Sequence, residues 1–154
     1  MTEKSTFEQA LDKLISVFSK EMQFMKVFNL DVLELNEKKT IIRFPMSDNL
    51  LGNVSHQILH GGVTASVLDS AGGIVAMAAT LAKNKSRLLE EQLASVANAA
   101  TIDLRIDYLR PGKGNHFIAE AEVLRCGSKI TAVQARLHND KNVLLAVAMA
   151  TYFI

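Results

Sequence analysis

Residues 60–79 read HGGVTASVLDSAGGIVAMAA, and this stretch is the strongest indication of the fold. It is too long for an ordinary strand and lacks strict alternation, so it predicts a buried helix from Gly62 to Ala79 that starts at His60-Gly61-Gly62. The first amide groups of a helix have no intrahelical acceptor, and the helix dipole favours negative charge there. Glycine has no Cβ, so a substrate carbonyl can approach this backbone closely. The pattern therefore favours stabilisation of a developing oxyanion at the helix start.

Asp69 is the only charged residue in this apolar run. A carboxylate in such surroundings is costly unless it is paired, hydrated or functional, so the sequence leaves a catalytic and a structural interpretation open. Gly61 and Asp69 are eight residues apart, which is about 12 Å along a helix that rises ~1.5 Å per residue. If both act on one carbonyl, one chain cannot supply both. The two roles together predict a composite site between two copies of the chain, in a dimer with twofold symmetry.

The composition excludes several classes of protein. The chain has 154 residues, which suits a single domain. Its net charge of +1 comes from interspersed acids and bases, so neither a nucleic-acid surface nor a polybasic membrane patch is indicated. Cys126 is the only cysteine, and the spacing of cysteine and histidine does not resemble a zinc site, so we expect neither a disulfide nor a metal or other cofactor. We find no signal peptide and no membrane span, and expect a cytoplasmic location.

The segment before the central run predicts one helix and two strands. Ser5 and Glu8 match a capping box, which indicates an amphipathic helix within residues 1–26. Its apolar positions follow helical spacing: Phe7, Ala10, Leu11, Leu14, Ile15, Phe18 and Met22. Strands are predicted at 27–35 and 40–44, with a polar turn between them, followed by a loop at 45–60. Residues 27–154 are expected to form the main domain.

The segment after the central run changes to the period of a strand. From Thr101 to Tyr108, we expect Ile102, Leu104, Ile106 and Tyr108 on one face and Thr101, Asp103, Arg105 and Asp107 on the other. A short helix is predicted at 87–96, and further strands at 117–124, 130–137 and 143–153. Their tight connections make the strands antiparallel neighbours. The order of elements predicts an α+β fold in which one antiparallel sheet packs around one helix.

Two stretches resemble the hot-dog fold acyl-CoA thioesterases, of the kind related to the phenylacetate-pathway thioesterase. They are His60-Gly61-Gly62 with Asp69 nine residues after the histidine, and residues 101–111, TIDLRIDYLRP. The resemblance spans residue 27 to the C-terminus. It implies a hot-dog fold, with an antiparallel sheet wrapped around a long central helix and an added N-terminal helix. It also implies hydrolysis of an acyl-CoA to free acid and CoA by a homodimer, or by a homotetramer built as a dimer of dimers.

The resemblance assigns roles to individual residues. Gly61 would donate its amide to the thioester oxygen, Asp69 would act as nucleophile or general base, and Thr101 would position water. Thr101 can equally be an ordinary strand threonine. His60 would organise the loop and line the site, and Gly62 would lie against the substrate.

One position departs from the family pattern. The family commonly has Asn or Gln six residues before the histidine, but here that residue is Val54 and the amide is Asn53. Either the loop is one residue longer and Asn53 takes this role, or the role is lost, or a neighbouring polar residue takes it, namely Ser55, His56 or Gln57. These four residues can also be ordinary polar residues of a surface loop, without a role in the site.

Substrate binding is predicted only in outline. Four basic residues at strand ends and turns are candidates for the CoA phosphates, although each can also be a solvated turn residue: Arg110, Lys113, Arg125 and Lys129. The apolar composition favours a medium or long aliphatic acyl group, and both the N-terminal helix and residues 81–98 could shape its pocket. A non-catalytic acyl-CoA binding module is the alternative. A hot-dog dehydratase or hydratase would need a His–acid spacing that this chain lacks.

Overall fold

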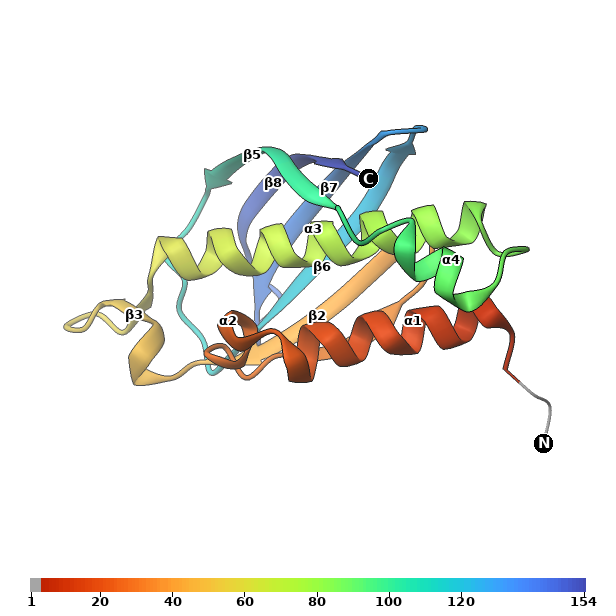
Figure 1. Cartoon of the computed structure of the whole chain (residues 1–154). Helices are drawn as coiled ribbons and strands as arrows, with labels where there is room; N and C mark the ends of the chain where they lie inside the picture. Colours follow the sequence, from red (N-terminus) through yellow and green to blue (C-terminus); the bar gives the residue numbers. More distant parts are fainter. Residues whose placement is uncertain (1–3) are drawn as a thin grey trace.

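A six-stranded antiparallel sheet curves around one long helix, α3 (Gly61–Lys83), in the computed structural model, which describes residues 4–154 (Figure 1). The strand order is β1-β2-β6-β7-β8-β5, so β5 and β1 are the two edges. The strands are β1 (Asp31–Leu35), β2 (Lys39–Pro45), β5 (Ala100–Tyr108), β6 (His116–Cys126), β7 (Ile130–Asn139) and β8 (Leu144–Phe153). This architecture confirms the α+β hot-dog fold.

Helix α3 forms the centre of the core. It starts one residue before the predicted helix and continues past Ala79 to Lys83, because residues 80–83 carry no helix breaker. Ala146, Ala148 and Ala150 of β8 are buried, and their small side chains leave room for the helix beside the sheet. By length and composition α3 could cross a membrane, but most of it is buried in the fold, as in the core helix of a soluble protein.

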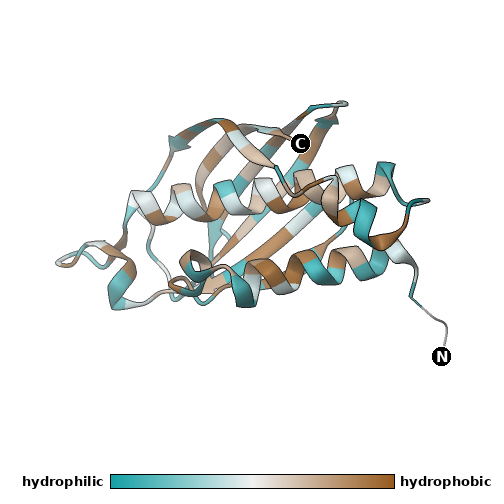
Figure 2. Ribbon diagram, in the orientation of Figure 1, coloured by the Kyte–Doolittle hydropathy of each residue, from teal (hydrophilic) through white to brown (hydrophobic). Residues whose placement is uncertain are grey.

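The N-terminal segment packs alongside α3. It begins with α1 (Thr6–Ser16), whose capping box is present as predicted, since the Glu8 amide donates to Ser5 Oγ and the Ser5 amide to Glu8 Oε2. Figure 2 shows hydrophilic and hydrophobic residues along α1, and the buried ones are the apolar Ala10 and Leu14. The predicted single helix is interrupted, however: a π-helix, η1 (Val17–Glu21), follows, and Met22 is extended before α2 (Gln23–Lys26). Apolar spacing alone cannot distinguish a π turn from a continuing α-helix.

Three further predicted boundaries need correction. Residues 27–30 are not strand, because Val27 caps α2 and Asn29 has a φ of 48°, so β1 begins at Asp31. The predicted loop at 45–60 contains a short 3₁₀ turn, η2 (Asp48–Leu50), and a hairpin of β3 (Leu51–Asn53) and β4 (Ile58–Leu59). Residues 81–83 belong to α3. The short helix predicted at 87–96 is present as α4 (Leu89–Ala94).

A bulge in β5 overturns the predicted alternation of that strand. Thr101 lies opposite Tyr152 of β8 and Asp103 lies opposite Thr151, so Ile102 is an extra residue in the ladder. Ile102 is consequently 55% exposed, although it was expected to share the inward face of Leu104. Thr101 therefore faces α3, whereas strict alternation had predicted that it would lie on the opposite face of the strand. The bulge thereby brings the Thr101 hydroxyl to the helix.

Candidate active site

Asp69 lies in the third turn of α3, half-buried and held by two hydroxyl groups. Its Oδ1 accepts a hydrogen bond of 2.9 Å from Thr101 Oγ1 and one of 3.3 Å from Tyr152 Oη. The same Tyr152 hydroxyl lies 2.8 Å from the main-chain oxygen of Asp69, so its single proton is shared between these two oxygens of Asp69. The carboxylate is therefore fixed from two strands at the β5–β8 edge of the sheet. Its position favours the catalytic interpretation of Asp69, since the carboxylate has no cationic partner among the ion pairs of residues 4–154.

Tyr152 reaches Asp69 because Gly72 leaves space for it. A Cβ on Gly72 would lie 2.2 Å from the tyrosine hydroxyl, which no side chain tolerates. Burial raises the pKa of Tyr152 far above its ordinary value, and the nearby Asp69 carboxylate raises it further. The phenol consequently stays protonated and remains a donor. Sequence reasoning missed Tyr152; the available signals were a lone tyrosine in an apolar strand and a glycine one turn after Asp69.

Replacing Tyr152 with Phe is expected to lower kcat on the order of tenfold to 10²-fold and to leave KM nearly unchanged. The ring keeps its packing, but Asp69 loses the donor that fixes its rotamer. Steady-state kinetics with one thioester substrate measures both constants. Because Tyr152 acts through Asp69, an unchanged kcat would show that Thr101 alone positions the carboxylate.

Two adjacent glycines provide a matched control for this positioning role. A Cβ on Gly73 would meet Tyr152 at 3.6 Å, an ordinary contact, whereas the same atom on Gly72 would displace the ring. Gly72→Ala should therefore reproduce the kcat loss of the phenylalanine variant. Gly73→Ala should leave Tyr152 in place and unfold at an equal or higher temperature, since alanine favours a helix over glycine.

The start of α3 presents one available amide. His60 is the N-cap, and its Nδ1 accepts a 2.8 Å hydrogen bond from the Gly62 amide. A Cβ on Gly62 would lie 2.9 Å from this nitrogen, so glycine is needed there. Tyr108 Oη donates to the Gly61 carbonyl at 2.8 Å. The Gly61 amide has no hydrogen-bond partner among the contacts of the described residues, and it is therefore the donor available to a ligand.

Asp69 and Gly61 open into different cavities of the same chain. The Asp69 cavity, about 250 Å³, is lined mostly by apolar residues of η1, α2, α3 and the start of β5. The Gly61 cavity, about 430 Å³, lies between the start of α3 and the loop after β5. The two cavities have no lining residue in common. Within one chain, the predicted oxyanion donor and the predicted acid are thus kept apart, as their spacing on one helix required.

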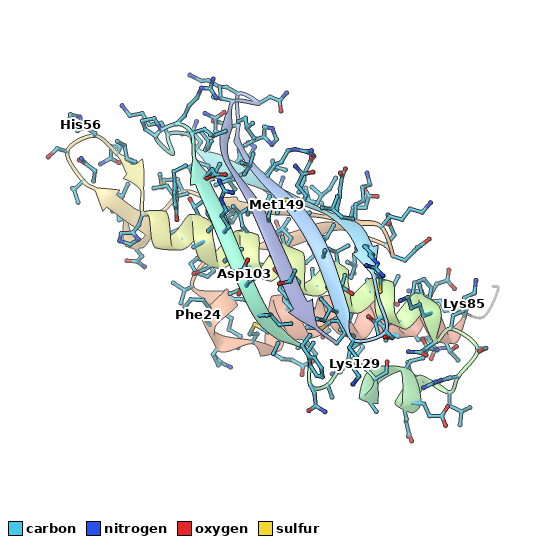
Figure 3. All side chains as sticks on the ribbon, turned by 90° about the horizontal axis from the view of Figure 1, so that it is seen from above. Phe24, His56, Lys85, Asp103, Lys129 and Met149 are labelled. Atoms are coloured by element: carbon cyan, nitrogen blue, oxygen red, sulfur yellow. The ribbon has the colours of Figure 1, made fainter. Side chains whose placement is uncertain are left out.

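The loop amides do not approach Asp69 within the chain. Asn53 Oδ1 accepts from the His56 amide, and the Gln57 side chain donates to the Val54 carbonyl, so these residues shape the β3–β4 hairpin. His56 lies at the tip of this hairpin, away from the middle of α3 (Figure 3). Among the hydrogen bonds of residues 4–154, none joins Asn53, Ser55, His56 or Gln57 to Gly61 or Asp69 of the same chain. Their role stays a prediction.

The four basic residues form two separate pairs. Arg110 lines the Gly61 cavity and donates to the Leu144 carbonyl at 3.0 Å, and Lys113 is exposed in the same loop. Arg125 and Lys129 line another cavity, of about 400 Å³, where Lys83 Nζ at the other end of α3 donates to the Gly127 carbonyl. The length of α3 separates the pairs. One chain cannot use all four on one phosphate group.

Comparison with known proteins assigns the family. A profile of the thioesterase superfamily matches residues 56–146, which include α3 and most of the sheet. The chain is 37% identical to a protein of Salmonella typhimurium, "Medium/long-chain acyl-CoA thioesterase YigI", over 97% of this chain and 96% of that one. The chain belongs to the thioesterase superfamily.

Solved structures of the thioesterase superfamily support this assignment. A Shewanella oneidensis protein related to the superfamily superimposes with a TM-score of 0.93 at 33% identity, covering 99% of both chains. The Escherichia coli PaaI protein, from the phenylacetic acid degradation operon, superimposes with a TM-score of 0.76 at 17% identity, covering 96% of this chain and 94% of that one. The second match shows the shared fold alone. The superfamily profile leaves out α1, η1 and α2, and residues of η1 and α2 line the Asp69 cavity.

Proposed function

We propose that the protein hydrolyses medium- or long-chain acyl-CoA thioesters to the free acid and CoA. The observation that carries this proposal is the Asp69 carboxylate, which two hydroxyl groups hold at the wall of an apolar cavity in a chain of the thioesterase superfamily. The name of the Salmonella relative, a medium/long-chain acyl-CoA thioesterase, supports the same substrate class. The apolar walls suit an aliphatic chain, and the carboxylate suits the carbonyl at its end.

Asp69 acts in its ionised form by either of two routes. As general base it takes a proton from water; the hydroxide adds to the carbonyl carbon, the carbon–sulfur bond breaks, and the departing thiolate takes the proton. As nucleophile it attacks the carbonyl carbon and expels the CoA thiolate, and water then cleaves the mixed anhydride. In both routes negative charge develops on the carbonyl oxygen. The Gly61 amide is suited to stabilise it.

The two halves of this site come together in a homodimer. Strand β5 pairs only with β8 among the described strands, so its outer edge is free to pair with another strand. Its first residues contact Asp69 through Thr101, and its last residue contacts Gly61 through Tyr108. Antiparallel pairing of β5 with β5 of a second copy places the Asp69 end of one chain beside the Gly61 end of the other. Twofold symmetry then generates two equivalent sites.

A series of acyl-CoAs of increasing chain length, with detection of the released thiol, tests the activity. Saturable release of CoA that is fastest for medium or long chains is the expected result. Saturable binding without any thiol release would instead establish the non-catalytic acyl-CoA binding module. The cytoplasmic location expected from the sequence and the dimer-of-dimers assembly stay predictions.

Removal of positive charge should weaken CoA binding in a salt-dependent way. Changing Lys113, Arg125 or Lys129 to Ala is expected to raise KM for acyl-CoA at low salt, with a smaller effect at high salt, because phosphate contacts are screened. KM for a short thioester without the nucleotide should stay the same. An equal rise for both substrates would show that these residues support the fold or the chemistry rather than the phosphates.

A further inference from the structure

Two cavities adjoin on the side of α3 that faces the N-terminal segment. The first is the Asp69 cavity of about 250 Å³. The second, about 330 Å³, lies nearer the start of α3, between that helix, α2 and the turn before β3. Only Phe24 and Ser66 line both. The two spaces therefore follow one another along the helix, and their boundary consists of these two side chains.

Phe24 is the bulky member of this boundary. Ser66 is small, and its hydroxyl is occupied by a 2.8 Å hydrogen bond to the Gly62 carbonyl. The Phe24 ring packs edge-on against Phe28, with ring centroids 5.2 Å apart, yet it remains 58% exposed. Phe28 itself is buried. One aromatic ring, anchored on one side and open to solvent on the other, thus separates the two spaces.

The backbone around Phe24 suits a side chain that moves while its neighbours stay fixed. Helix α2 has four residues and lies between the extended Met22 and the left-handed Asn29. The next residue, Met25, is buried, and its sulfur lies 3.0 Å from the hydroxyl of Ser70 of α3, whose single proton is shared with the Ser66 carbonyl. Phe24 lies on the outer edge of this segment (Figure 3). The segment is therefore anchored to α3 one residue away from a ring that no hydrogen bond fixes.

The walls of the Asp69 cavity are adaptable. Three of the six methionines in the chain line it, namely Met22, Met25 and Met77, together with Phe18 and Phe24. Methionine is unbranched and polarisable, so it adjusts to ligands of different shape better than branched side chains do. A cavity of this kind accepts several chain lengths, up to the limit that the Phe24 ring sets.

We propose that Phe24 sets the preferred acyl-chain length of this enzyme by partitioning the two cavities. With the ring in its observed position, a medium chain fits in the Asp69 cavity. A longer chain displaces the ring and continues into the second cavity along α3. This inference rests on the proposed hydrolysis of acyl-CoA, and it assigns the specificity of that reaction to a residue outside the superfamily profile.

The test compares kcat/KM for straight-chain saturated acyl-CoAs from short to long. Phe24→Ala joins the two cavities and should raise the long-to-medium ratio of kcat/KM about tenfold or more, while Phe24→Trp enlarges the partition and should lower that ratio to a similar extent. Phe153→Ala is the matched control, because this exposed aromatic residue of β8 lines neither cavity. It should keep the wild-type profile.

The outcomes separate this inference from the proposed function. If the wild-type protein releases no CoA from any substrate, the proposed function fails. If the wild-type protein is active and both Phe24 variants keep its chain-length profile, the function stands and the partition is overturned. Opposite shifts of the profile in the two variants support the partition, because general damage to the fold would shift both in the same direction.

Discussion

Asp69→Asn is expected to lower kcat for acyl-CoA hydrolysis by at least the ~10²- to 10⁴-fold that a single general acid–base group contributes. The amide has nearly the shape of the carboxylate and can still accept from Thr101 and Tyr152, but it neither takes a proton from water nor attacks a carbonyl. Single-turnover measurement of thiol release under saturating enzyme isolates the chemical step. KM should change little, since the cavity walls remain.

The control for this experiment is Asp103→Asn. Asp103 is an exposed aspartate on the same edge strand as Thr101, and it faces away from α3 as its partner Thr151 does. It should keep wild-type kinetics, and both variants should keep the wild-type oligomer size and unfolding temperature. A wild-type rate with Asp69→Asn would remove Asp69 from the chemistry and restore its structural interpretation.

The central elements could be predicted because local patterns determine them. The length of the apolar run indicates α3, and the period of two over 101–108 and later segments indicates the strands. The capping box at Ser5 and Glu8 is equally local. By contrast, the π-helix at Val17–Glu21 preserves an apolar spacing that an α-helix would also show. The sequence cannot distinguish the two, so the path of the chain toward Phe24 was not predicted.

The parts of the site that escaped prediction depend on long-range register. Tyr152 lies 83 residues from Asp69 in sequence, and the contact exists only because β8 pairs with β5 in one register beside Gly72. The bulge at Ile102 arises from the same pairing, and strict alternation assigned Thr101 to the wrong face. Asp69 itself could be found because an isolated carboxylate in an apolar helix is a local anomaly. Thr101 and Tyr152, which hold the carboxylate, are not marked by any local pattern in the sequence.

At the start of α3, the sequence also does not show which glycine amide is free to donate a hydrogen bond. From the residue types alone, Gly61 and Gly62 are equivalent as amide donors, and only the family resemblance selects Gly61. In the structure, the Gly62 amide donates to His60 Nδ1, whereas the Gly61 amide has no hydrogen-bond partner among the described residues. The difference depends on the orientation of the His60 imidazole, and the spacing of residues in the sequence does not predict that orientation. It makes a substitution at Gly61 more informative than one at Gly62.

Gly61→Pro is expected to lower kcat by ~10²- to 10³-fold, the usual cost of losing one oxyanion donor. Gly61 is the first residue of α3, where proline is well tolerated. His60 has φ −64° and ψ 135°, which a residue before proline readily adopts. The substitution should therefore remove the amide hydrogen and preserve the helix. Gly61→Ala is the matched control: it keeps the amide, its Cβ would meet Tyr108 at an ordinary 3.4 Å, and it should lose much less activity than the proline variant.

Mixing the Asp69→Asn and Gly61→Pro chains should restore activity that neither has alone. In a heterodimer with shared sites, one site receives both substitutions and the other receives none. Random exchange makes about half of the dimers mixed, so about one quarter of the wild-type kcat per site should return. Subunit exchange is followed independently with differently tagged chains. If mixed dimers form and activity stays at the level of the single variants, then Gly61 and Asp69 do not share a site across the interface, and β5 does not join them.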